Sequence, residues 1–182
     1  MVISRSARIF IIAMGRIVKT TDRPAVAGRR DTRIISDVNA TMMHLRSNAL
    51  VDSRRVAILG FCMGGRVAYL MAAASKDFKA AITWYGGSCF RQWGDGPTPF
   101  ERTAQISCPI QGHFGATDQN PTLEDMAKLD AELTRHGKTH DFYVYQDTGH
   151  SFMDPHHPDR YVEKSDRESW ARGLEFLRQH LT

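Results

Sequence analysis

The stretch ILGFCMGGRVAYLMAA, residues 58–73, decides the fold of this chain. It runs from an apolar, strand-like segment through a cysteine framed by glycines into a helix-like pattern. Residues 60–64 match the G-x-S-x-G nucleophile elbow, with Cys62 in place of serine. Such a nucleophile sits at a strained strand-to-helix turn, where side chains two residues away would collide with their neighbours. The pattern predicts that Cys62 is a nucleophile, and the alternative is a buried structural cysteine.

The helix that follows the elbow supplies the chemistry that a cysteine nucleophile needs. Its first backbone N–H groups point toward Cys62, which lowers the pKa of the thiol and favours the thiolate. The backbone N–H of Met63 is expected to supply one arm of an oxyanion hole.

From about residue 35 the chain alternates between helical and strand-like periodicity. This alternation is typical of an α/β domain with a mainly parallel sheet. The expected strands are 55–59, 80–85, 108–118 and 141–145. The expected helices lie at 35–45, 64–75, from Pro121 to just before Gly137 with Asn120 as cap and Leu123 on the apolar side, and 170–181. Residues 86–105 are rich in glycine, proline and polar residues, which predicts a long surface loop.

Two later strands end at residues that complete a catalytic constellation. Asp118 ends the third predicted strand, and His150 follows the fourth. In α/β-hydrolases the acid and then the histidine follow the nucleophile on such loops, at the carboxyl edge of the sheet. We therefore predict that His150 exchanges a proton with Cys62 while Asp118 orients the imidazole. The alternatives are a helix-capping aspartate and an ordinary loop histidine.

Weaker candidates for substrate contact surround the same edge. Phe61 adjoins Cys62, and Trp84 and Tyr85 end a strand at the edge where Cys62 lies. Tyr85 either lines the substrate pocket or packs within the strand. Arg66, in the first turn after the elbow, either contacts an anionic substrate or is an exposed helix arginine.

Other titratable side chains give weaker signals. His113 lies in an apolar strand and is expected to be a core or near-site residue rather than a catalyst. Asp154, His156, His157 and Asp159 share one loop, but their spacing matches no strong ligand pattern, so we predict no metal site.

Charge is divided unevenly along the 182 residues. Residues 1–33 hold eight basic residues against two acidic ones, a net +6, whereas residues 34–182 hold sixteen against eighteen, a net −2. The basic character belongs to one end, which argues against a nucleic-acid-binding face across the fold. We therefore divide the chain into a basic N-terminal segment, 1–33, and an α/β domain, 34–182.

Cysteine usage and hydropathy bear on the compartment. Cys62, Cys89 and Cys108 are an odd number of cysteines without close pairing, so we expect no disulfides and a reducing, cytoplasmic setting. Cys89 and Cys108 have no elbow around them and are expected to be bystanders. The apolar run at 9–14 is six residues long, whereas a membrane span needs about 20, so we expect no membrane partner.

Four segments in order, VDSRRVAILGFCMGG, ITWYGG, GATDQNPT and YQDTGHSFMDP, resemble the dienelactone hydrolase family over residues 35–182. The resemblance implies a three-layer α/β-hydrolase fold with Cys62, Asp118 and His150 as its triad. It also implies opening of small lactones or esters through a Cys62 acyl-enzyme, without metal or organic cofactor. Carboxymethylenebutenolide is the substrate that gives such enzymes their name.

The sequence departs from this family before the elbow. Members normally carry several strands and a helix there, which supply a second oxyanion amide, a glutamate and a substrate-binding arginine, and residues 1–34 match none of these. Members with dienelactone activity also carry an arginine shortly after the histidine, which HSFMDPHH at 150–157 lacks. We expect a fold without the usual N-terminal strands, with 7–18 as a substitute strand. The exposed sheet edge then favours a homo-oligomer. The alternative function is a weakly active or inactive remnant that serves as an oligomeric or partner-binding domain.

Overall fold

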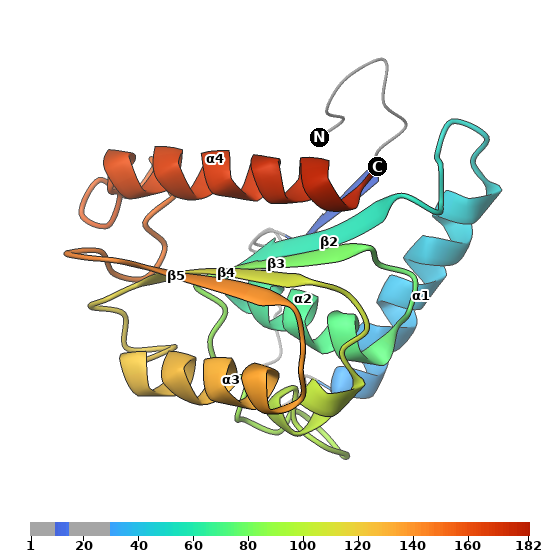
Figure 1. Ribbon diagram of the computed structural model, residues 1–182, viewed down its shortest axis with the longest axis horizontal. Coiled ribbons are helices and arrows are strands. Elements are labelled where there is room, and N and C mark those ends of the chain that lie inside the picture. The colour runs from blue at the N-terminus through green and yellow to red at the C-terminus, as the bar shows by residue number, and fades with distance from the viewer. Residues whose placement is uncertain (1–9, 15–29) are drawn as a thin grey trace, which may run out of the picture.

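The computed structural model describes residues 10–14, in their backbone, and 30–182. Within these residues the chain forms a parallel sheet in the order β1-β2-β3-β4-β5, so neighbours in the sheet are also neighbours along the chain (Figure 1). The elements are β1 (Phe10–Met14), α1 (Asp31–Ser47), β2 (Val56–Phe61), α2 (Met63–Ala74), β3 (Ala80–Trp84), the short 3-10 helix η2 (Phe100–Gln105), β4 (Ile110–Gly115), α3 (Leu123–Arg135), β5 (His140–Tyr145) and α4 (Glu163–His180). The α/β class and the strand expected within 7–18 are confirmed.

Two apolar cores lie on opposite faces of this sheet. The first, which we call the α1–α3 core, joins Met42 of α1, Val67 of α2 and Leu133 of α3 to the sheet. The second, the α4 core, packs Leu177 of α4 against Leu59 of β2 and neighbouring strand residues. Figure 1 shows α4 on one side of the sheet and α2 and α3 on the other. The fold therefore has the three layers that were predicted.

The start of α3 differs from the prediction that Asn120 caps it. Thr122 is the N-cap: its hydroxyl accepts a hydrogen bond from the Asp125 N–H, and the Asp125 carboxylate accepts one from the Thr122 N–H. This reciprocal capping box fixes the first turn two residues later than expected. Leu123, expected on the buried side, is the first residue of α3 and is 52% exposed. Asn120 is thereby available for a role at the site described below.

The segment 86–105 is largely the loop that its composition predicted, but only part of it lies on the surface. It contains η2, and Cys89, Trp93 and Thr103 within it are buried. The Thr103 hydroxyl lies 2.7 Å from the hydroxyl of Tyr69 on α2, so polar residues of this segment are satisfied inside the protein. Glycine and polar content alone did not reveal this packing.

In the part of the chain that the structure describes, no helix is long and apolar enough to cross a membrane.

Candidate active site

Cys62 occupies a strained turn between β2 and α2. Its φ of 55° and ψ of −118° lie where residues with a β-carbon are rarely found. The Cys62 N–H donates to the Trp84 carbonyl at 3.0 Å, which ties the turn to β3. A β-carbon at Gly60 would overlap the carbonyl group of Gly64, so glycine is required for the strand and helix to approach this closely. The result is an exposed thiol at the carboxyl edge of the sheet.

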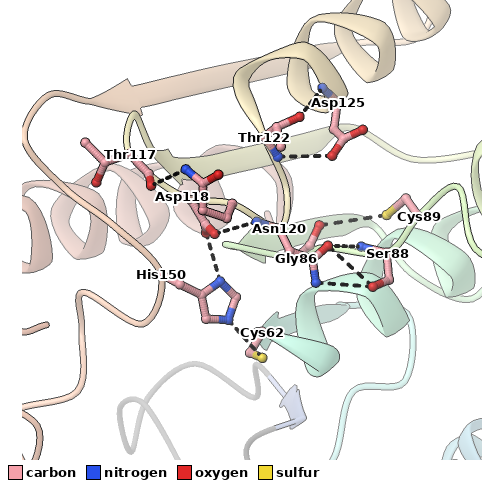
Figure 2. Close-up of polar contacts among 11 residues, drawn as sticks. Cys62, Gly86, Ser88, Cys89, Thr117, Asp118, Asn120, Thr122, Asp125 and His150 are labelled. Carbon is pink, nitrogen blue, oxygen red and sulfur yellow. Dashed lines mark hydrogen bonds and ion pairs between the residues drawn. The ribbon is translucent and has the colours of Figure 1, made fainter. Parts of the chain in front are cut away.

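The structure brings the three predicted catalytic side chains into one line, as Figure 2 shows. Nε2 of His150 lies 3.1 Å from Sγ of Cys62, and Nδ1 of His150 lies 2.8 Å from Oδ2 of Asp118. The Asp118 carboxylate is buried, whereas the His150 ring is partly exposed. This is the geometry in which one nitrogen of an imidazole exchanges a proton with a nucleophile while the other is held by a carboxylate.

Contacts between two loops set the distance between the acid and the histidine. The N–H of Thr117, beside the acid, donates to the Thr148 carbonyl, beside the histidine, at 2.9 Å. A β-carbon at Gly115 would overlap that same carbonyl, so the end of β4 can lie directly against the histidine loop. The Thr148 hydroxyl also lies 2.9 Å from that of Ser165 on α4. The loop that carries His150 is therefore fixed from both sides.

The electrostatics of the site favour a charged pair. The hydrogen bond from His150 lowers the pKa of the Cys62 thiol against the opposing effect of burial, and the Met63 N–H lowers it further. Burial acts to lower the pKa of His150, but its hydrogen bonds to Asp118 and Cys62 outweigh burial and raise that pKa to about 9. Around neutral pH these shifts favour thiolate beside imidazolium.

The other two cysteines have the opposite environment. Burial raises the pKa of Cys89 to about 12 and that of Cys108 to about 12. Both remain protonated thiols at neutral pH, which sets Cys62 apart as the cysteine with thiolate character.

Aromatic side chains surround the predicted triad at different depths. The ring of Tyr85 meets that of His150 edge-on, with centroids 5.2 Å apart. Phe61 is half-buried and stacks on Trp84 at 5.0 Å. Trp84 itself is fully buried and stacks on His113 on its other side, which corrects the expectation that it contacts substrate. Gly173 of α4 lets that helix pack directly onto the indole, which helps to cover it.

Arg66 is neither an exposed helix arginine nor open to a substrate. Its side chain is fully buried, and its guanidinium contacts both carboxylate oxygens of Asp31 at 2.6 and 2.9 Å. It also donates to the carbonyls of Ser88 and Arg91 and lies 3.7 Å from the centroid of the Trp93 ring. Its donors are thus used within the protein, which corrects both predictions for this residue.

His113 proves to be a core residue. It is fully buried, its Nδ1 lies 3.0 Å from the Tyr145 hydroxyl, and its Nε2 lies 2.9 Å from Oε1 of Gln111. Burial lowers the pKa of His113 to about 3, so the ring is neutral in the folded protein. One of the two predicted alternatives for this residue is thereby selected.

Asn120 is a site residue that the sequence reasoning assigned elsewhere. Its N–H donates to Oδ1 of Asp118 at 2.8 Å, and its side chain contacts Ser88. The spacing D-x-N is typical of an aspartate that accepts a hydrogen bond from the backbone two residues later, and this was the available signal. A cavity of about 320 Å³ adjoins these groups. Its lining residues are Thr117, Asp118, Gln119, Asn120 and His150.

Comparison with known proteins identifies a family and individual proteins that are similar to this chain. The model of the family described as "Dienelactone hydrolase family" matches residues 17–181, so the match begins inside the basic segment 1–33. A protein of Methylorubrum extorquens named "Putative carboxymethylenebutenolidase" is 30% identical over 155 residues, which make up 82% of this chain and 52% of that protein. A protein of Bradyrhizobium sp named "Probable 2-oxo-3-(5-oxofuran-2-ylidene)propanoate lactonase" is 30% identical over 161 residues, or 86% and 63% of the two chains.

A solved structure shows the same fold. The crystal structure titled "Putative Dienelactone Hydrolase from Klebsiella pneumoniae subsp. pneumoniae MGH 78578" has a TM-score of 0.76 and 26% identity, and the alignment covers 82% of this chain and 62% of that one. This chain therefore spans roughly half to three fifths of the length of the relatives that it matches. The family match extends over most of its residues. This chain belongs to the dienelactone hydrolase family.

Proposed function

We propose that the chain hydrolyses small lactones or esters through a covalent acyl-enzyme on Cys62. The observation that carries the proposal is the aligned Cys62, His150 and Asp118 at a nucleophile elbow, with contacts of 3.1 and 2.8 Å. Membership of the dienelactone hydrolase family supports ester and lactone bonds as the substrate class. The relatives named as a carboxymethylenebutenolidase and a lactonase favour a cyclic ester.

Acylation uses the charged pair directly. The Cys62 thiolate attacks the carbonyl carbon, and the electron pair of the carbonyl moves to its oxygen, toward which the Met63 N–H donates. When the tetrahedral intermediate collapses, the bond to the leaving oxygen breaks and the imidazolium of His150 protonates that oxygen. The product is a thioester on Cys62 and a hydroxyl group, which stays attached to the acyl group if the substrate is a lactone.

Deacylation returns the site to its starting state. The neutral His150 takes a proton from water, and the resulting hydroxide attacks the thioester carbonyl. The thiolate of Cys62 leaves and the carboxylic acid product is released, with imidazolium again beside thiolate. Through both steps Asp118 keeps Nε2 of His150 directed at the reacting atoms and stabilises the positive ring.

The substrate is expected to meet aromatic rings beside the triad. Tyr85 contacts His150, and Phe61 precedes the nucleophile and is half-buried. These two side chains offer flat apolar surface of the kind that holds a small unsaturated ring. We assign substrate contact to Tyr85 and Phe61, and none to the buried Trp84 and Arg66.

The test is hydrolysis of a small activated aryl ester by the purified chain. Cys62→Ala should abolish the activity, and Cys89→Ala, which removes a buried thiol outside the site, should retain it. Mass spectrometry of the quenched reaction should find one acyl group, on the peptide that contains Cys62. Circular dichroism confirms that all three proteins are folded. Equal background rates from folded wild-type and Cys62→Ala proteins would refute catalysis and leave a partner-binding domain as the alternative.

A further inference from the structure

A single asparagine connects the acid of the triad to a second loop. The N–H of Asn120 donates to Oδ1 of Asp118 at 2.8 Å, while Oδ2 of the same carboxylate faces His150. The side chain of Asn120 points to the segment after β3, where its Oδ1 accepts from the Ser88 N–H at 2.9 Å (Figure 2). Its Nδ2 also donates to the Ser88 hydroxyl at 3.2 Å. The backbone and the side chain of one residue thus engage different parts of the site.

The Ser88 side of this link is held in place. Ser88 has a φ of 59°, and a β-carbon at Gly87 would overlap both the backbone and the side chain of Asn120. The Ser88 carbonyl accepts a hydrogen bond of 3.1 Å from Nε of Arg66, whose side chain is fully buried. The asparagine is therefore fastened to a segment whose position is fixed by a permanently charged group in the interior.

The consequence for Asp118 follows from its two oxygens. A carboxylate with one hydrogen bond can rotate about its χ2 torsion, since terminal torsions of this type are broad. The second hydrogen bond, from the Asn120 N–H, fixes the plane of the carboxylate and keeps Oδ2 on His150. Partners of this kind, one contact away from the reacting groups, orient functional side chains.

We propose that Asn120 is the positioning residue of this triad and holds Asp118 against His150 through its side-chain attachment to Ser88. Its effect on hydrolysis rests on the function proposed above, but its effect on the His150–Asp118 contact does not. The residue acts through Asp118 and does not take part in bond making.

Asn120→Ala removes the attachment and leaves its own N–H in place. We expect the pKa of His150, followed by NMR of its ring, to fall by about 0.5 to 1, which corresponds to one hydrogen bond of moderate strength. We expect kcat for the activated ester to fall about threefold to tenfold, with KM within about twofold of wild type. Asn48→Ala is the matched control, because the Asn48 side chain also bonds a backbone N–H, that of Leu50, but lies on a distant surface.

Ser88→Ala provides the second arm. It keeps the Ser88 N–H and removes only the hydroxyl, so its effects should be smaller and in the same direction. In the Asn120→Ala background the substitution should have no further effect, because the attachment is already lost. This non-additivity distinguishes a connected pair from two independent structural residues, and Ser88→Ala decides the matter if Asn120→Ala fails to fold.

The outcomes separate the two proposals. An unchanged His150 pKa in folded Asn120→Ala, or effects of the two substitutions that simply add, would overturn the positioning role. Absence of ester hydrolysis by the wild-type chain would overturn the proposed function instead, while the NMR titration still decides the role of Asn120.

Discussion

Two pairs, each of a carboxylate and a basic side chain, lie near the nucleophile elbow, and they differ in exposure and in the ability to exchange a proton. Asp31 and Arg66 meet through two contacts of 2.6 and 2.9 Å, with their side chains 4% and 0% exposed. Asp118 and His150 meet through one contact of 2.8 Å, with the histidine 31% exposed. The guanidinium cannot lose its proton and all of its contacts are internal, whereas the imidazole presents its second nitrogen to Cys62. The two pairs therefore differ in the side chain that faces the carboxylate. The buried guanidinium of Arg66 can only stabilise the fold, whereas the partly exposed imidazole of His150 can also exchange a proton.

Removing His150 from the solvent-facing pair should produce the largest effect, and chiefly on rate. His150→Asn removes the proton carrier, so kcat for the activated ester should fall by about 10,000-fold. The free energy of unfolding, measured with urea, should also fall, because the buried Asp118 carboxylate loses its cation, and the rates are therefore compared between folded proteins. A variant that keeps a tenth of the activity would show that this pair is not part of the catalytic machinery.

Severing the buried pair should instead affect stability. Arg66→Ala leaves the Asp31 carboxylate buried without its cation, and such a change costs about 3 to 5 kcal/mol. Urea unfolding measures the loss, and the double variant Asp31→Asn/Arg66→Met should recover part of it because no charge remains buried. A loss below about 1 kcal/mol from Arg66→Ala would mean that this pair is not structural.

The pH dependence of cysteine alkylation and of hydrolysis should further distinguish the solvent-facing pair from the buried one. The pKa of Cys62 lies below its ordinary value, so alkylation by iodoacetamide should rise with pH through a midpoint below that of a free thiol, about 8.5. In the mechanism that we propose, acylation needs the imidazolium of His150, so kcat/KM should decline as pH rises through about 9. The buried Cys89 and Cys108 should react only after unfolding. Equal labelling of all three cysteines in the folded protein would contradict this assignment.

The smallest effect concerns the ring beside Arg66. Trp93→Phe keeps an aromatic face 3.7 Å from the guanidinium but weakens the cation–π attraction, which should cost about 0.5 to 1 kcal/mol besides any packing loss. The change should appear in urea unfolding and leave the pH profile of hydrolysis unaltered. A displaced profile would show that a change beside Arg66 reaches the triad through Ser88 and Asn120.

The Cys62–His150–Asp118 site and the Asp31–Arg66 pair also differ in how far the sequence predicts them. Cys62, Asp118 and His150 were found because each lies at a strand end within a short motif, and parallel strands place such ends at one edge. Asp31 was assigned to the basic segment 1–33, yet it begins α1 and pairs with Arg66, 35 residues away. No local pattern encodes that contact.

Local capping and burial explain the remaining differences. Asn120 has the composition of a helix cap, but Thr122 and Asp125 form the better cap and leave Asn120 to the site. Trp84 lies at the predicted edge, but packing by α4 over Gly173 decides that its indole is covered. These outcomes depend on which element, distant in the sequence, packs against the residue. The periodicity of the sequence does not reveal such contacts.

The order of the strands has a consequence for synthesis on the ribosome. Each strand from β2 to β5 pairs with the one made just before it, so the sheet can grow at one edge as the chain emerges. Helix α4 follows every strand and closes the opposite face with Phe176, Leu177 and neighbouring residues. Its Ser165 also anchors Thr148, in the loop that carries His150. The loop that carries His150 therefore gains this contact only when the last helix docks.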